Sequence, residues 1–224
     1  MIMKERLKLS IKTKRLKLYP LSDAEIQNFI DNSADAALAE AYAQMLDGCK
    51  NNPEQRQWYA PWTMEAKDGN RIGELGFKGP SSGNNVEIGY GIIKEYEGQG
   101  YTTEAAKALI EWAFNNEEVL FVEAEADEYN AASVRVLEKL GFVQYGQGEE
   151  GPRFVKSKAC TSYTSLGMSV GLCFGLAIGI AVFDEMTIGM CTGLMLGLCL
   201  GASKDAQEKK KISALKKEKY GLEE

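Results

Sequence analysis

Glu97-Gly98-Gln99-Gly100-Tyr101-Thr102 is the stretch of sequence that decides the fold. It follows an apolar, strand-like run over residues 86–93 and opens a helical pattern over residues 102–116. Glycine lets the backbone approach a ligand closely, and the first turn of a helix has four N–H groups without intrahelical partners. This order of strand, glycine turn and helix start therefore predicts an anion site suited to a pyrophosphate.

Further blocks flank the glycine turn in a fixed order. Glu87-Ile88-Gly89-Tyr90 precedes it, a strand-like run covers residues 119–126, and the block from Asn130 to Phe142 ends in Leu-Gly-Phe. With these blocks, residues 12–156 resemble the GNAT superfamily of acetyl-CoA-dependent N-acetyltransferases, most closely the ribosomal-protein-alanine acetyltransferase branch. The resemblance implies an α/β fold with a mixed, mostly antiparallel twisted sheet flanked by helices.

The resemblance also implies an activity and a co-substrate. We expect direct transfer of an acetyl group from acetyl-CoA to a primary amine, on a protein N-terminus or a small molecule, in a ternary complex. The residues expected to bind acetyl-CoA are Glu97, Gly98, Gln99, Gly100, Tyr101, Thr102 and Asn130. Asn130 either bonds to the cofactor arm or caps the following helix, and both roles are compatible. The family commonly has Gln or Arg where this chain has Glu95, so binding rests on the backbone amides.

Two residues are candidates for the proton transfers that the reaction needs. Glu87, alone in an apolar strand, is the candidate general base, acting directly or through water. The alternative is a structural Glu87, with Glu123 or Glu125 as the base. Many family members carry a Tyr as the thiolate's proton donor where this chain has Leu137. Ser133 is the nearest hydroxyl to that position and is the candidate donor.

The acceptor site is less defined by the sequence. Trp58, Tyr59, Trp62 and Tyr90 either line an amine pocket or belong to the core. The resemblance implies an acceptor cleft built by residues 31–57. Whether the amine belongs to a protein, an amino acid, a polyamine or a drug does not follow from these residues.

Composition excludes several classes of function. The 224-residue chain has a formal charge of -6, which does not suggest nucleic-acid binding, and no His, which excludes His-based triads and metal sites. We expect no metal. The five cysteines form no C-x-x-C pair and are interpreted as reduced, and residues 1–17 are basic without a signal-like apolar core. The expected location is the cytoplasm or the cytoplasmic face of a membrane.

Local patterns predict the elements before the glycine turn. A strand is expected over residues 12–19, and Ser22 with Glu25 forms a capping-box pattern that opens a helix. A second helix is expected over residues 34–49. Strands over residues 58–67 and 71–77 are joined by a hairpin turn, and a loop begins at Gly79.

The C-terminal part is a two-copy repeat unrelated to the acetyltransferase blocks. Its glycines recur every fourth residue, at 167, 171, 175 and 179 and again at 189, 193, 197 and 201. This spacing places the glycines on one face of each helix, as in small-xxx-small contacts of membrane helices. We expect domain 1–156, a glycine-zipper helical hairpin over 157–203 and a charged tail over 204–224. Residues 163–202 form either a membrane hairpin or a soluble homo-oligomer contact.

Two classes of function therefore remain. The first is an acetyltransferase that its hairpin holds at a membrane or in an oligomer. The second is a catalytically weak acyl-CoA-binding sensor or assembly protein, which Glu95 and Leu137 favour.

Overall fold

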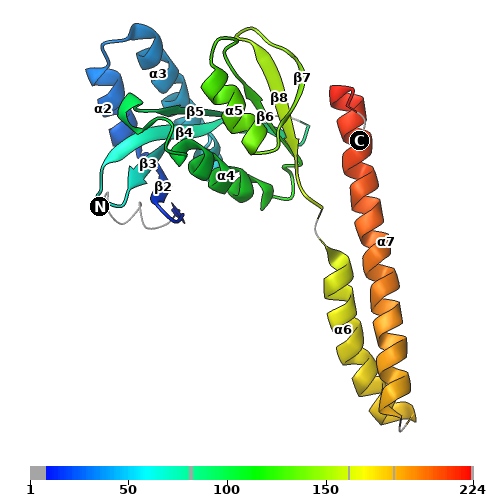
Figure 1. Ribbon diagram of the computed structural model, residues 1–224. Coiled ribbons are helices and arrows are strands. Elements are labelled where there is room, and N and C mark those ends of the chain that lie inside the picture. Colours follow the sequence, from blue (N-terminus) through cyan, green and yellow to red (C-terminus); the bar gives the residue numbers. More distant parts are fainter. Residues whose placement is uncertain (1–8, 81–82, 161, 184, 223–224) are drawn as a thin grey trace. The chain divides into compact units, whose positions relative to one another are not determined.

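The computed structural model describes residues 9–80, 83–160, 162–183 and 185–222. The chain forms two compact units, Met1–Ser157 and Lys158–Glu224 (Figure 1). The first unit contains the sheet and the helices that surround it, and the second contains two long helices. The glycine turn, Glu87 and Ser133 all belong to the first unit.

A twisted sheet of eight strands organises the first unit, in the order β1-β2-β3-β4-β5-β6-β8-β7. The strands are β1 (Ile11–Lys12), β2 (Leu16–Pro20), β3 (Trp62–Ala66), β4 (Arg71–Pro80), β5 (Asn85–Ile92), β6 (Phe121–Glu125), β7 (Val143–Gln147) and β8 (Pro152–Ser157). Only the pair of β5 and β6 is parallel within this described sheet. The mixed, mostly antiparallel sheet expected from the sequence is confirmed.

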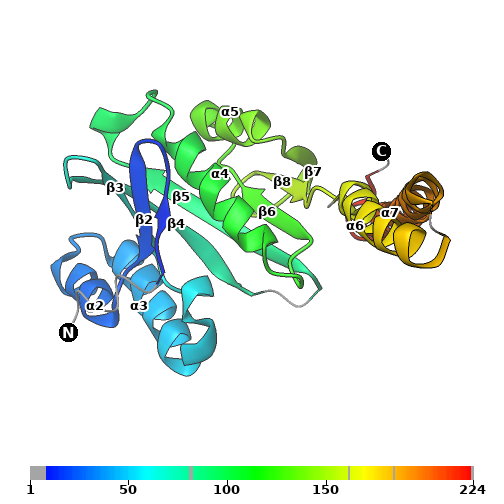
Figure 2. The same cartoon turned by 90° about the horizontal axis from the view of Figure 1, so that it is seen from below.

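Helices cover both faces of this sheet (Figure 2). On one face lie α2 (Asp23–Asn32) and α3 (Ala36–Asn51), and on the other lie α4 (Tyr101–Phe114) and α5 (Ala131–Lys139). Two short 3₁₀ turns, η1 (Pro53–Trp58) and η2 (Lys94–Tyr96), precede β3 and the glycine turn. The predicted capping box of Ser22 and Glu25 is present at the start of α2.

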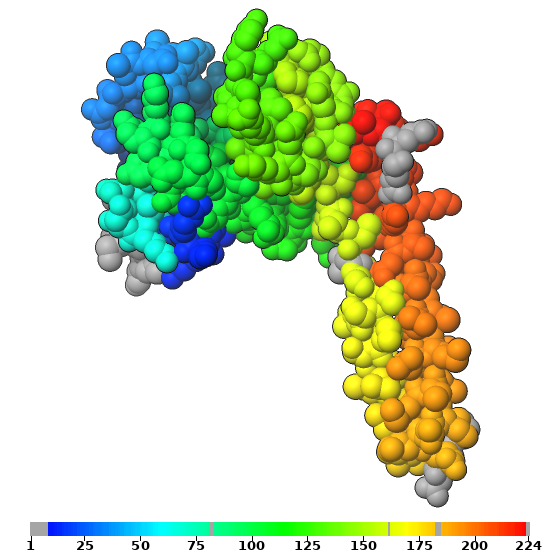
Figure 3. All heavy atoms as spheres, in the orientation of Figure 1, coloured from blue at the N-terminus to red at the C-terminus, as the bar shows by residue number. Residues whose placement is uncertain are grey.

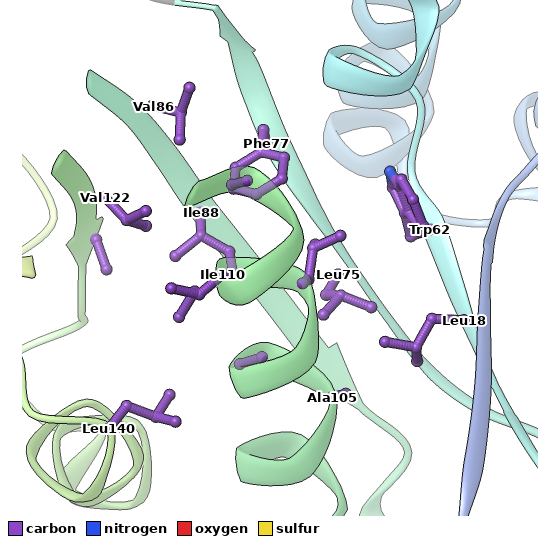
Figure 4. Close-up of a cluster of buried hydrophobic side chains, with 14 of the residues drawn as sticks. Leu18, Trp62, Leu75, Phe77, Val86, Ile88, Ala105, Ile110, Val122 and Leu140 are labelled. Atoms are coloured by element: carbon purple, nitrogen blue, oxygen red, sulfur yellow. The ribbon is translucent and has the colours of Figure 1, made fainter. Parts of the chain in front are cut away.

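The main core lies between the sheet and α4 (Figure 4). Apolar side chains of α4 pack on strand residues that point to the same face, including Leu75, Ile88 and Val122. The rings of Trp58 and Trp62 lie 4.8 and 5.1 Å from the ring of Trp112, measured between centroids. These two tryptophans are therefore core residues, and the interpretation that places them in an amine pocket is wrong.

Several predicted boundaries differ from the structure, each for a local reason. The expected strand over residues 12–19 is divided into β1 and β2, because Thr13 forms hydrogen bonds to Leu16 and closes a turn between them. Residues from Pro53 to Trp58 form a 3₁₀ turn, so β3 begins only at Trp62. The strand β4 continues through Gly79 to Pro80. The hairpin of β7 and β8 was not predicted.

In the second unit, the two glycine repeats face each other. Its elements are α6 (Tyr163–Ile178), a π-helical turn η3 (Gly179–Phe183) and α7 (Met186–Tyr220). A methyl group built on Gly171 would overlap the carbonyl oxygen of Gly193, and one on Gly175 would overlap that of Gly189. The backbones thus approach so closely that no larger residue fits at these positions. The helix α7 extends without a break through the charged segment to Tyr220.

Candidate functional site

The glycine turn forms an open helix start. Gly98 and Gly100 have φ angles of +70° and +77°, a conformation that strongly favours glycine. The amide of Glu104 makes the first intrahelical bond, to Gly100 O (3.1 Å), so the three preceding amides point out of the helix. Apart from Gly98 and its two chain neighbours, no heavy atom of the described residues lies within 4 Å of where a Cβ would stand at Gly98. The amide of Glu97 already donates to the carbonyl oxygen of Lys94 (3.2 Å), so the backbone donors around the space that an anion can enter belong to residues 98–102.

Arg15, which the sequence analysis did not select, supports this turn from the N-terminal strands. Its Nη1 donates to the carbonyl oxygen of Gln99 (2.9 Å), and its Nε donates to Glu104 (2.7 Å). Its guanidinium also lies 4.2 Å from the ring centroid of Tyr101. Although burial raises the pKa of Glu104, bonds from Thr13 and Arg15 lower it more, so this carboxylate stays ionised. Arg15 places a cation beside the turn that lacks a basic residue at position 95.

The parallel strands β5 and β6 separate before β5 ends. Their pairing joins Asn85 to Phe121, Val86 to Val122 and Glu87 to Glu123, and it ends there. Beyond Glu87, β5 continues to Ile92 and stays paired with β4. One edge of β5 therefore faces the opening between the diverging strands, and Glu87 lies where the opening begins.

Glu87 is partly exposed and already has a basic partner. Its side chain is 30% exposed, and its carboxylate forms an ion pair with Lys78 Nζ (2.5 Å). Burial lowers the pKa of Lys78, but the bond to Glu87 raises it more, so the pKa of Lys78 lies above its ordinary value. Glu123, opposite Glu87 in the register, accepts hydrogen bonds from Asn85 and from the Tyr145 hydroxyl.

Glu125, the other alternative base, has a structural position. Its side chain is 8% exposed and accepts bonds from the amides of Glu150 (2.6 Å) and Gly151 (3.2 Å) and from Arg153 Nε (3.2 Å). Burial raises the pKa of Glu125, but these bonds lower it more. Glu125 therefore stabilises the turn between β7 and β8, which leaves Glu87 as the less constrained acid.

Ser133 and Tyr90 form a hydroxyl pair at the start of α5. The amide of Ser133 donates to Asn130 Oδ1 (2.9 Å), so Asn130 caps α5 as one of its two expected roles requires. The Tyr90 hydroxyl lies 3.0 Å from Ser133 Oγ. Burial raises the pKa of Tyr90 more than the bond to Ser133 lowers it, so the phenol stays protonated at neutral pH. Leu137, where the family commonly has a Tyr, is buried in the core.

A cavity of about 200 Å³ lies between α3 and the strands β4 and β5. Its helical wall is Leu38, Ala41, Tyr42 and Met45, and its base includes Gly76, Gly89 and Gly91. Gly76 pairs with Gly89 in the sheet register, so missing side chains on two neighbouring strands create the space. Glu74 lines the cavity but is held by Arg71 (2.7 Å) and the Tyr42 hydroxyl. Lys78 also lines it and links it to Glu87.

The sequence profile of the acetyltransferase (GNAT) domain matches residues 13–143, which is more than half of the chain. The chain belongs to the GNAT acetyltransferase family. The matched region contains the glycine turn, Glu87, Tyr90 and Ser133, and it ends at the start of β7.

Curated relatives support the same assignment over shorter stretches. An uncharacterised N-acetyltransferase of Bacillus subtilis, YjdG, is 39% identical over 84 residues, which cover 37% of this chain and 50% of the relative. A putative ribosomal N-acetyltransferase of the same organism, YdaF, is 36% identical over 104 residues, covering 44% of this chain and 57% of the relative. The chain thus spans between half and three fifths of these two relatives' length.

Solved structures share the fold of the first unit. A putative ribosomal-protein-serine acetyltransferase from Vibrio cholerae superposes with a TM-score of 0.53 at 20% identity, over 67% of this chain and 98% of that chain. A ribosomal L7/L12 alpha-N-protein acetyltransferase, solved with coenzyme A, superposes with a TM-score of 0.55 at 15% identity, over 66% and 98%. These likenesses concern the fold alone.

The position of Glu125 generates a stability prediction. Glu125→Gln should lower the free energy of unfolding of residues 1–157 by about 1.5–3 kcal/mol at pH 7, because charged hydrogen bonds are lost. Because the folded state lowers the pKa of Glu125, the ionised carboxylate stabilises the folded state at pH values above the unfolded pKa of about 4.3. The difference between wild type and variant should therefore shrink as the pH falls below that value.

Urea unfolding followed by circular dichroism at pH 7 and pH 3 measures this difference. The matched control is Glu111→Gln, because Glu111 is 67% exposed and its contact with Lys107 is long, at 3.9 Å. Equal stability of Glu125→Gln and wild type at pH 7, or a loss that does not change with pH, would show that this carboxylate does not hold the turn.

Proposed function

We propose that this protein transfers an acetyl group from acetyl-CoA to a primary amine by direct attack in a ternary complex. The observation that carries this proposal is the open glycine turn beside the diverging strands of a family acetyltransferase fold. The amides of residues 98–102 and the Arg15 guanidinium would hold the pyrophosphate, whereas the expected contribution of the Glu97 amide is ruled out by its bond to Lys94 O. The edge of β5 beyond Glu87 would pair with the amide groups of the pantetheine arm, and Asn130 would line its path.

The acceptor amine would enter the cavity between α3 and the sheet. Lys78 forms an ion pair with the Glu87 carboxylate, and an entering ammonium can replace Lys78 as the cationic partner. Glu87 then takes the ammonium proton directly or through one water. The free amine attacks the thioester carbonyl carbon, the carbon–sulfur bond breaks, and the sulfur leaves as a thiolate, while the nitrogen of the new amide releases its second proton to water.

The hydroxyl pair would stabilise the leaving group. In this proposal Ser133 Oγ donates a hydrogen bond to the developing thiolate. The Tyr90 hydroxyl lies 3.0 Å from Ser133 Oγ, where either oxygen can donate, and 3.3 Å from the Ser133 carbonyl oxygen, and we assign its proton to Ser133 Oγ. Hydrogen bonds in such a chain strengthen one another. The thiolate does not need a stronger acid, since a thiol pKa of about 8.5 makes it a good leaving group. A proton from solvent then completes the coenzyme A thiol.

The cavity favours an amine with an apolar neighbour. Leu38 and Met45 contribute apolar walls, and Arg71 neutralises Glu74, so few acidic groups are available for a second cationic centre. One structural neighbour is named as an alpha-N-protein acetyltransferase and another as a spermidine N-acetyltransferase. The charge balance supports a protein N-terminus or a small apolar amine over a polyamine.

The second candidate is a catalytically weak acyl-CoA-binding sensor. The ion pair between Lys78 and Glu87 favours it, because a base held by a lysine is less available to a substrate. Release of coenzyme A thiol in the presence of amines, including N-terminal peptides, distinguishes the two. Binding without release would support the sensor.

The pyrophosphate assignment predicts different effects of two variants at Gly98 that match in shape and differ in charge. Asn and Asp adopt positive φ more readily than other non-glycine residues and have nearly the same shape. Gly98→Asp should weaken acetyl-CoA binding to residues 1–157 at least about tenfold more than Gly98→Asn, because it adds a negative charge beside the pyrophosphate. Titration calorimetry measures both, and equal affinities of the two variants would overturn the assignment.

The base assignment predicts a selective loss of turnover. Glu87→Gln should reduce kcat by about 10²–10⁴ at neutral pH while acetyl-CoA affinity stays unchanged, because only proton transfer is removed. Glu125→Gln is the control and should keep its kcat at temperatures where it is folded. If kcat of Glu87→Gln equals that of wild type, Glu87 is structural and Glu123 is the next acid to test.

The hydroxyl pair predicts non-additive effects on kcat. Tyr90→Phe and Ser133→Ala should each lower kcat, and the double variant should be no slower than Ser133→Ala, because Tyr90 acts through Ser133. Steady-state kinetics of wild type, the two single variants and the double variant on one amine give the double-mutant cycle that tests this. Effects that multiply in the double variant would mean that the two hydroxyls act independently.

A further inference from the structure

The glycine faces of the second unit are fully used inside the unit. A Cβ added to any of the eight repeat glycines, from Gly167 to Gly201, would overlap backbone of the partner helix. The contact between α6 and α7 therefore occupies the small-residue face of both helices. A second copy of the chain cannot use these glycines for association while the two helices stay paired.

Large apolar side chains point outward from this helix pair (the yellow and orange segment of Figure 3). They include Leu166, Val170, Phe174, Ile178, Ile180, Ile188, Met195, Leu196, Leu198 and Leu200, with exposures of 39–73%. Successive residues of a helix are about 100° apart around its axis. The side chains at positions 195, 196, 198 and 200 therefore cover most of the surface of α7 outside its glycine face. An apolar surface that surrounds the pair matches a lipid environment better than a single protein contact.

The polar atoms of the two helices are compatible with lipid. Residues 163–181 and 186–203 contain no charged side chain. The hydroxyls of Ser169 and Thr192 donate to backbone carbonyl oxygens one turn earlier, of Ser165 (3.0 Å) and Ile188 (2.8 Å). Internal bonds of this kind satisfy hydroxyl groups without water.

Length and charge place the ends of the pair at membrane interfaces. The stretches Tyr163–Ala181 and Met186–Ser203 extend about 28 and 27 Å as helices, close to the ~30 Å hydrocarbon thickness of a bilayer. In the most apolar 18-residue stretch of each helix, only 11% and 22% is buried. The core helices of soluble proteins are mostly buried, so these two helices differ from them. At the open end, Lys204 lies over the ring of Tyr163, and three further lysines follow at positions 209–211.

We propose that α6 and the first half of α7 insert into a lipid bilayer as a two-pass helical hairpin. The turn that contains Glu185 crosses the bilayer, and the lysine-rich open end stays on the cytoplasmic side, as the positive-inside rule requires. The first unit and the C-terminal segment of α7 are connected to the open end and remain on that side. The occupant of the exposed apolar surface is the acyl-chain region of the bilayer.

The native cysteines report on this arrangement without any substitution. Cys173, Cys191 and Cys199 are exposed on the helix pair, Cys160 is exposed before α6, and Cys49 is buried in the first unit. Full-length protein is synthesised cell-free with preformed vesicles of phosphatidylcholine and phosphatidylglycerol. Vesicles isolated by flotation are treated with a membrane-impermeant maleimide, and peptide mass spectrometry identifies the modified thiols.

The proposal expects flotation that resists alkaline carbonate, modification of Cys160, and protection of Cys173, Cys191 and Cys199 until SDS is added. Full-length protein that stays soluble without lipid, with these three thiols reactive, would overturn it. A soluble oligomer with the three thiols protected would also overturn it and assign the surface to a second copy.

Paired variants separate the outer surface from the glycine face. Phe174→Glu with Leu196→Glu places charges on the outer surface and should abolish carbonate-resistant flotation. Gly171→Leu with Gly175→Leu disturbs the helix contact but keeps the apolar content, so it should still float. Acetyl-CoA binding by the first unit verifies that each variant is folded. Unchanged flotation of the glutamate variant would contradict the proposal.

Discussion

The separation of two parallel strands is the constraint on which the candidate site depends. Pairing of β5 with β6 ends at Glu87 and Glu123, while β5 stays anchored to β4 for its remaining length. The resulting opening exposes one edge of β5, places Glu87 at its start and leads towards the glycine turn that follows η2. On one face of β5 lies the cavity under α3, and on the other Tyr90 reaches Ser133. In the proposed mechanism this opening joins the glycine turn to the cavity under α3.

Glycine, which has no side chain beyond hydrogen, has three different structural effects in this chain. At Gly98 and Gly100 the missing side chains allow a left-handed backbone that directs amides outward. At Gly76 and Gly89 they leave the cavity between the sheet and α3. In the second unit the repeat glycines bring two helix backbones into contact and leave the larger residues facing outward. Glycine costs about 1 kcal/mol relative to Ala within a helix, so a repeat of eight requires a compensating contact, which the helix pair supplies.

Local patterns predicted the parts of the fold that local physics determines. The capping box at Ser22 and the helix start after the glycine turn at Gly98–Gly100 depend on neighbouring residues only, and each is present. Arg15 and Tyr90 act through partners 84 and 43 positions away, so no spacing rule connects them to the site. The tryptophans were ambiguous for a related reason, since an aromatic residue in a strand suits a pocket and a core equally well. The cavity arises from glycines that are neighbours only in the sheet register.

A crystal structure of residues 1–157 with coenzyme A tests the central claim most directly. We expect the diphosphate against the amides of residues 98–102, the pantetheine arm along the edge of β5 beyond Glu87, and the sulfur within hydrogen-bond distance of Ser133 Oγ on the path to Glu87. Coenzyme A bound away from the glycine turn, or a sulfur distant from both Ser133 and the opening at Glu87, would contradict it.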